Sequence, residues 1–151
     1  MTACETLWFE DVRPGETFHF GPYHVDRAEL LEFNRRWDPL PIHLDDDAAR
    51  ARGLEGLSAS GQYTLCIKQA MLNGAAWREA IIGALGFDEL RFPHPVYPGD
   101  DIRLEIETLE TRPSRSKPDR GIVRFHFRLY NQDEVLVLSY LDTVMFARRP
   151  G

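Results

Sequence analysis

The sequence predicts an α+β domain in which one long helix packs against an antiparallel sheet. Residues 102–147 contain three segments in which apolar and polar side chains alternate. Residues 58–74 form an apolar segment with helical character, and most helical segments precede the strands. A chain that runs through helices first and strands afterwards is typical of α+β folds, because α/β folds alternate the two kinds of element.

The three C-terminal strands are predicted from a two-residue periodicity in residues 102–110, 122–130 and 135–147. Alternation of this kind indicates antiparallel strands with one buried face. In the first two segments the side chains expected on that face are Ile102, Leu104, Ile106 and Thr108, followed by Val123, Phe125, Phe127 and Leu129.

The N-terminal part predicts a short strand that ends near Val25 and a helix that follows it. Asp26 with Glu29 three residues later resembles a capping box, which marks the start of a helix. Trp37 is expected on the apolar face of this helix. The helix should stop near Asp38, because the residue before a proline disfavours the α conformation.

Two further helices are predicted. Residues 44–53 begin with acidic side chains, carry arginines near their end and finish at a glycine, so they form a short helix. Residues 58–74 form the long helix, for which Ser60 is the expected cap. Residues 75–86 are interpreted as an extension or a repeat of this helix, with strands only after that segment.

Length and composition indicate an ordinary globular protein. The 151 residues are expected to form one domain, 1–151, with 43% hydrophobic and 28% charged side chains. The net charge of -6 argues against nucleic-acid binding, which requires a basic surface. The first residues lack the features of a secretory signal, and no apolar run is long enough to span a bilayer. We therefore expect a cytoplasmic protein that binds neither nucleic acid nor membrane.

The sequence favours neither a disulfide framework nor a metal site. Cys4 and Cys66 form no CxxC pair, which suits a reducing compartment, and Cys66 is expected to be buried. No Cys/His cluster with metal-ligand spacing occurs. Four basic residues before the second C-terminal strand are expected in a solvated loop, with phosphate binding as the alternative. They are Arg112, Arg115, Lys117 and Arg120.

The segment WDPLPIHLD, residues 37–45, places a carboxylate and an imidazole around two prolines. Pro39 and Pro41 restrict the backbone, so the segment is expected to be a rigid loop that holds Asp38 and His43 close together. A neutral imidazole beside a carboxylate is a general base that takes a proton from water. The alternative is structural: Asp38 caps or pairs locally, and His43 hydrogen-bonds to the core.

Two other segments are candidate parts of a site. Residues 56–62, GLSASGQ, bring free backbone N–H groups to the start of the long helix, where they can stabilise an oxyanion, although a plain capped helix explains the same pattern. Residues 91–102 hold His94 between prolines before a Pro-Gly-Asp turn, and His94 is interpreted as structural. His24 and Asp26 form a rival pair, but Asp26 already serves as a cap.

Taken together and in this order, these segments resemble the MaoC-like dehydratases, the (R)-specific enoyl-CoA hydratase group of hotdog-fold proteins. The family motif Asp-x-Asn-Pro-hydrophobic-His is matched by residues 38–43, with Asp, Pro and His at the family spacing. The acidic helix LDDDAARARG, the helix start GLSASGQYT and the segment RFPHPVYPGDDI, which is similar to the family's Pro-Val-x-Pro-Gly-Asp, follow it. The resemblance covers residues 9–146.

The resemblance implies a single hotdog domain, a sheet wrapped around the long helix, that pairs as a homodimer or a dimer of dimers. It implies reversible syn addition of water to a trans-2-enoyl thioester of coenzyme A or acyl carrier protein, giving an (R)-3-hydroxyacyl thioester without a cofactor. Asp38 and His43 are expected to activate the water, and the Gly61 N–H to meet the charge on the thioester oxygen. The prolines would then pre-organise the acid–base pair.

The sequence departs from the family pattern at two positions. Leu40 replaces the family's Asn, and Ser60 replaces a His before the helix glycine. In some members a serine farther along the helix lines the site, and its position matches Gln69, so Ser60 and Gln69 are expected to bind substrate. Two alternatives remain open: an acyl-CoA thioesterase on the same fold, and a non-catalytic acyl-binding hotdog subunit.

Overall fold

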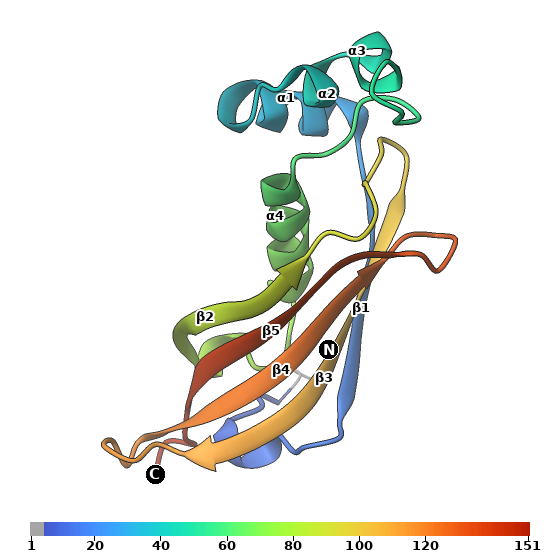
Figure 1. Ribbon diagram of the computed structural model, residues 1–151. Coiled ribbons are helices and arrows are strands. Elements are labelled where there is room, and N and C mark those ends of the chain that lie inside the picture. The colour runs from blue at the N-terminus through green and yellow to red at the C-terminus, as the bar shows by residue number, and fades with distance from the viewer. Residues whose placement is uncertain (1–4) are drawn as a thin grey trace.

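A computed structural model describes residues 5–151, so Cys4 lies outside the described residues. A five-stranded sheet curves around α4 (Gly61–Leu72), and three shorter helices lie beyond one end of α4 (Figure 1). Every neighbouring pair of strands is antiparallel, which confirms the predicted α+β class. The strand order is β1 (Thr17–His24), β3 (Asp101–Pro113), β4 (Arg120–Tyr130), β5 (Leu136–Ala147) and β2 (Ile81–Arg91).

The inward faces of β3, β4 and β5 form most of the core, and the predicted alternation is confirmed. All eight side chains expected on the buried face of the first two strands are buried. The strand register places these buried side chains next to one another across the sheet. Ile106 lies opposite Phe127, and Phe127 lies opposite Tyr140 of β5. The rings of Phe127 and Tyr140 stack with centroids 4.8 Å apart, a cross-strand contact that stabilises the sheet beyond its buried area.

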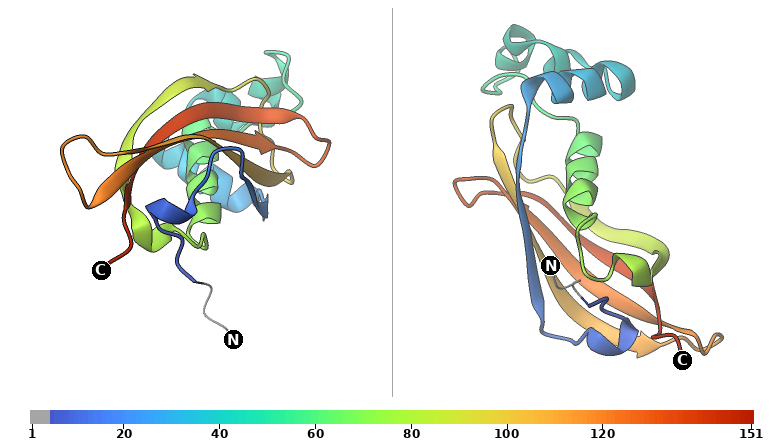
Figure 2. Two further views of the ribbon diagram at one scale, coloured as in Figure 1. Left: turned by 90° about the horizontal axis from the view of Figure 1, so that it is seen from below. Right: turned by 180° about the vertical axis from the view of Figure 1, so that it is seen from behind.

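The helix α4 lies in the concave face of the sheet (Figure 2). Its predicted cap is confirmed, because the Ser60 hydroxyl accepts a hydrogen bond from the Gln62 N–H. Two adjacent rows of α4 side chains are buried, and Lys68 lies in one of them. The expected burial of Cys66 is wrong, since this side chain points to the exposed side of the helix.

The helix α1 (Arg27–Trp37) begins as predicted. The Asp26 carboxylate accepts a hydrogen bond of 2.9 Å from the Glu29 N–H, and the helix ends before Asp38. The prediction for Trp37 is wrong, because this side chain is 64% exposed. The buried positions of α1 are instead Leu30 and Asn34, four residues apart on one face.

Two short helices follow. Instead of the expected loop, α2 (Pro41–Leu44) forms one helical turn, because a proline fits the first turn of a helix, where its missing N–H is not needed. The predicted acidic helix is confirmed as α3 (Asp46–Arg50), which the Asp45 carboxylate caps through the Ala48 N–H.

The helical interpretation of residues 75–86 is wrong. A short 3-10 helix, η2 (Arg78–Ala80), leads directly into β2, which pairs with β5 as an edge strand. Three register irregularities interrupt this pairing, and most β2 side chains are exposed. A strand of this kind has no clean two-residue alternation, so the usual signal of a strand is missing.

Candidate active site

Asp38 and the start of α4 line a cavity of about 420 Å³, and His43 lies directly behind Asp38. The cavity lies where α1 and α2 approach the first turn of α4, and the chain that follows β2 closes another side. Its walls are Asp38, Ile42, Leu54, Ser58, Ala59, Ser60, Gly61, Gln62, Thr64, Phe92, His94, Pro95, Val96 and Val137. Three of the five predicted site residues are therefore wall residues, and His43 contacts this group directly.

The predicted acid–base pair is close in space. Asp38 is the C-cap of α1 and His43 lies in α2, so the two prolines turn the chain back between them. The Nε2 atom of His43 lies 3.5 Å from the Oδ2 atom of Asp38. His43 is buried, whereas Asp38 is partly exposed to the cavity. A small molecule in the cavity can thus reach the carboxylate, with the imidazole directly behind it.

The other ring nitrogen of His43 fixes its tautomer. Nδ1 lies 2.8 Å from the carbonyl oxygen of Ser58. A carbonyl oxygen only accepts hydrogen bonds, so Nδ1 carries the hydrogen and donates it. In the neutral ring, Nε2 then has a free lone pair directed toward Asp38. This is the protonation state that a general base requires.

Ser60 links the pair to α4. Its hydroxyl donates a hydrogen bond of 2.7 Å to Oδ2 of Asp38, the same oxygen that faces His43. The same hydroxyl accepts from the Gln62 N–H at the start of α4. Hydrogen bonds to a carboxylate are stronger than those between neutral groups. Ser60 therefore orients Asp38, in addition to capping the helix.

Asn34 makes hydrogen bonds to the backbone of the residues that form the site. The sequence analysis did not single it out. Its amide nitrogen donates to the carbonyl oxygens of His43 and Ser58, at 2.8 and 3.3 Å. Its amide oxygen accepts from the Ser60 N–H at 3.3 Å. Asn34 is fully buried, so these bonds replace those that water would make. The only sequence signal is an asparagine four residues after Leu30 on the inner face of α1.

Gly61 begins α4 with its N–H beside the cavity. Within residues 5–151 no acceptor takes a hydrogen bond from this N–H, as expected for the first turn of a helix. The ring of Phe92 lies against the glycine, because a Cβ atom on Gly61 would be 2.9 Å from it. The donor is thus free, and an aromatic ring forms the wall beside it.

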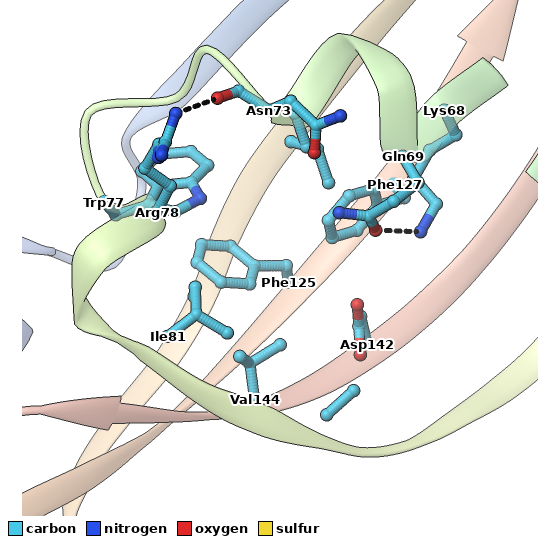
Figure 3. A pocket seen from close by; sticks show the side chains of 12 residues that line it. Lys68, Gln69, Asn73, Trp77, Arg78, Ile81, Phe125, Phe127, Asp142 and Val144 are labelled. Atoms are coloured by element: carbon cyan, nitrogen blue, oxygen red, sulfur yellow. Dashed lines mark hydrogen bonds between the residues drawn. The ribbon is translucent and has the colours of Figure 1, made fainter. Parts of the chain in front are cut away.

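Gln69 is not part of this cavity. It lines a second cavity of about 650 Å³ between α4, η2 and the sheet (Figure 3). Lys68 and Asp142 line the same cavity, and neither was singled out in the sequence. Burial lowers the pKa of Lys68 and raises the pKa of Asp142 to about 6. The signal for Asp142 was its place among the inward-facing residues of β5.

The other sequence candidates lie in different surroundings. His94 lines the Asp38 cavity, and its Nδ1 atom is 2.7 Å from the carbonyl oxygen of Pro95. His24 pairs with Asp101 at 2.8 Å, while Asp26 caps α1. The four basic residues lie at and between the ends of β3 and β4, at the far end of the molecule from α1 (Figure 1).

Residues 5–151 have neither a metal-binding cluster nor a membrane-spanning helix. This part of the chain contains no group of three or more His, Cys, Asp or Glu side chains arranged to hold a metal ion. It also contains no helix that is both long enough and apolar enough to cross a membrane.

Solved structures with the same fold are known. The MaoC-like dehydratase from Rhodospirillum rubrum is 35% identical, with a TM-score of 0.90 over 96% of this chain and 99% of that one. The R-hydratase PhaJ1 from Pseudomonas aeruginosa is 25% identical, with a TM-score of 0.77 over 95% of this chain and 88% of that one.

Sequence comparison also finds similarity to hydratases and dehydratases of this kind. The mesaconyl-CoA hydratase of Cereibacter sphaeroides is 30% identical over 150 residues, which are 94% of this chain and 41% of that protein. Residues 10–125, which include Asp38, His43 and Gly61, match the model of the MaoC like domain. The predicted resemblance is thereby confirmed, and the chain belongs to the MaoC-like dehydratase family of hotdog proteins.

Proposed function

We propose that the protein is a hydratase or dehydratase that interconverts a trans-2-enoyl thioester and an (R)-3-hydroxyacyl thioester. The observation that supports this most is the position of the His43 imidazole, whose Nε2 atom lies 3.5 Å from the Asp38 carboxylate at the edge of a cavity. Such a pair can hold one water molecule and take its proton. Asp38 and His43 are the proposed catalytic residues.

In this reaction a single water molecule would contact both Asp38 and His43. Its oxygen forms a bond to C3 while one of its protons passes to the pair. The electrons of the C2–C3 double bond move toward the thioester oxygen. The pair then returns a proton to C2, which re-forms the thioester carbonyl. Because one pair on one face of the substrate handles both the water and the proton, the addition is syn.

The Gly61 N–H is the proposed partner of the thioester oxygen. It is a free backbone donor at the positive end of α4, and it borders the same cavity as Asp38. Negative charge grows on the thioester oxygen only during the reaction, so this donor stabilises the transition state more than the substrate. Removing one such donor typically costs about 3 kcal/mol. Ser60 would position Asp38 at the substrate-binding site.

The thioester carrier in this proposal is coenzyme A or acyl carrier protein, which present the same arm to the enzyme. The name of the mesaconyl-CoA hydratase relative favours coenzyme A. That relative is more than twice as long as this chain, so its particular substrate does not transfer directly. The reaction class is the part of the proposal that both similar hydratases support.

Hydration and thioester hydrolysis are separated by one assay. Purified protein is incubated with crotonyl-CoA and with trans-2-octenoyl-CoA, and both the enoyl absorbance and free thiol are followed. A hydratase consumes the double bond and releases no thiol. Thiol release with an intact double bond would overturn the proposal in favour of a thioesterase. Binding without either change would favour a non-catalytic acyl-binding subunit.

We further propose that two copies pair through the outer edge of β2. This edge has no neighbouring strand within residues 5–151. It carries exposed apolar side chains, among which Leu85 is 55% exposed. An open strand edge with apolar side chains favours association with another strand. Pairing of two β2 edges would join the two sheets into one and cover these residues.

A further inference from the structure

The second cavity has an aromatic middle between two polar sides. Its volume is about 650 Å³, and Trp77 and Phe125 are among its walls. Lys68 and Asp142 lie on one side, and the side chain of Arg78 lies on the opposite side (Figure 3). A cavity of this volume is typical of a small-molecule site, in which a few polar groups fix the orientation of the ligand.

Lys68 is a buried amine at this cavity. It is 5% exposed, and within residues 5–151 no carboxylate forms an ion pair with it. Its Nζ atom donates a hydrogen bond of 3.3 Å to the Gln69 amide oxygen and lies 5.4–5.7 Å from the centres of three aromatic rings. Burial lowers the pKa of Lys68, and the charge of Asp142 opposes this. A lysine amine in such surroundings is a nucleophile, because its neutral form carries a free lone pair.

Asp142 supplies an acid–base group near this amine. It is 5% exposed, and its Oδ1 atom has no hydrogen-bond partner in the part of the chain that the structure describes. Burial raises its pKa to about 6, so it exchanges protons near neutral pH more readily than an ordinary aspartate. Lys68 and Asp142 line the cavity without contacting each other, so a reacting carbon atom can lie between them.

The opposite side of the cavity suits an anionic group. The Arg78 guanidinium donates through Nε to the Glu79 carboxylate and through Nη1 to the carbonyl oxygen of Asn73, at 2.9 and 3.3 Å. Its Nη2 atom makes no hydrogen bond within residues 5–151, so donors remain there. Hydrogen bonds between a guanidinium and a carboxylate are stronger than those between neutral groups. A ligand that extends from Lys68 to Arg78 is therefore expected to carry a carboxylate at its far end.

We propose that Lys68 is a nucleophile that forms a Schiff base with a small oxo acid, an aldehyde or ketone that also carries a carboxylate. The Nζ lone pair forms a bond to the carbonyl carbon, and Asp142 takes a proton from the nitrogen and passes it to the former carbonyl oxygen. This oxygen leaves as water with both hydrogens of the neutral amine, and a C=N bond replaces the C=O bond. Trp77 and Phe125 contact the middle of the ligand, and Arg78 binds its carboxylate.

Reductive trapping tests this reaction, and the sequence provides an internal control. Lys68 and Lys117 are the only lysines of the chain, and Lys117 is exposed in the loop between β3 and β4. The full chain is incubated with cyanoborohydride and either 4-formylbenzoate or its neutral methyl ester. Peptide mass spectrometry gives the modified fraction of each lysine, and the ratio of the two corrects for the intrinsic reactivity of each probe. The reaction involves neither Asp38 nor His43, so its failure leaves the proposed hydratase reaction unaffected.

The expected result is that 4-formylbenzoate modifies Lys68 at least about tenfold more than Lys117, and that this excess is lost with the methyl ester. Equal or greater modification of Lys117 by 4-formylbenzoate would overturn the proposal. An equal excess with the ester would overturn the assignment of the ligand carboxylate to Arg78.

Variants test the individual groups. Asp142→Asn keeps the shape of the side chain and should lower the modification of Lys68 at least about tenfold, because the proton carrier is lost. Faster modification would contradict this role, since it would show that Asp142 only holds Lys68 in its charged form. Arg78→Met should lower the modification by 4-formylbenzoate to the level of the ester. Lys117→Met is the matched control and should leave the modification of Lys68 unchanged.

Discussion

The hydroxyl of Ser60 donates a hydrogen bond of 2.7 Å to the carboxylate of Asp38, joining the end of α1 to the start of α4. Through this contact, one residue orients the proposed acid–base pair and caps the helix that carries the Gly61 N–H. The reacting groups of the proposed mechanism are therefore fixed relative to each other by the ends of two helices.

Replacing Ser60 with Ala should lower both stability and activity. The variant loses a helix cap and a hydrogen bond to a carboxylate, which together contribute about 2 kcal/mol to the free energy of unfolding. Asp38 then loses its orientation, and hydration of an enoyl thioester should fall about tenfold. Urea unfolding and the absorbance assay measure the two effects. Ser114→Ala, in the exposed β3–β4 loop, is the control. Hydration at the wild-type rate by Ser60→Ala would show that Ser60 does not orient Asp38 for the reaction.

Asn34 should be more important for stability than for direct chemistry. Asn34→Ala leaves the carbonyl oxygens of His43 and Ser58 and the Ser60 N–H without their buried partner. We expect a loss of about 3 kcal/mol in the free energy of unfolding, because each unsatisfied buried group is costly. Glu32→Ala, on the exposed side of α1, is the control and should change little. Equal stability of the two variants would contradict this role.

Asp142 should make the protein less stable as the pH rises. Its pKa is about 6 in the folded state against an ordinary 3.8, so the folded state binds more protons than the unfolded state between these values. Stability is therefore lost as the pH rises from about 4 through 6, by about 3 kcal/mol in total. Asp142→Asn should remove this loss.

The measurement for Asp142 is urea unfolding of wild type and variant at pH 4, 5, 6 and 7.5. As the pH rises, the unfolding free energy of wild type should fall relative to that of Asp142→Asn. Asp133→Asn, in the exposed turn before β5, serves as the control. A difference that is constant across this range would show that Asp142 ionises as readily in the folded as in the unfolded state.

The β2 edge gives a prediction about association. Wild type should sediment as a dimer or as a larger even-numbered assembly. Leu85→Glu should sediment as a monomer with an unchanged circular dichroism spectrum, because a charge replaces an apolar contact at the interface. Leu109→Glu changes an exposed leucine on β3 and should leave the assembly intact. A monomeric wild type would contradict the proposed pairing.

The parts of the fold that the sequence predicted are those with local signals. β3 and β4 alternate cleanly because one face of each strand is buried, and the cap of α1 is a contact between Asp26 and Glu29, three residues apart. The first half of β2, up to Gly86, was assigned to a helix because its side chains are exposed and its register is irregular. Its strand conformation depends on pairing with β5, which no local pattern reveals.

The residues of the candidate site also fall into those with a local sequence signal and those without one. Asp38 and His43 were found because they lie in one short motif, and the structure brings them together. Asn34 was missed because its role depends on carbonyl groups that lie nine and twenty-four residues away. Lys68 and Asp142 come from different elements, so their common cavity exists only after the sheet has closed around α4.

In the proposed mechanism, Asp38 and His43 together activate water for addition to an enoyl thioester. The decisive measurement is the rate of enoyl-absorbance loss with crotonyl-CoA or trans-2-octenoyl-CoA for wild type, Asp38→Asn and His43→Gln, with folding checked by circular dichroism. We predict hydration by wild type without thiol release, and a loss of at least about 100-fold in each folded variant. Hydration at the wild-type rate by either folded variant would contradict the claim.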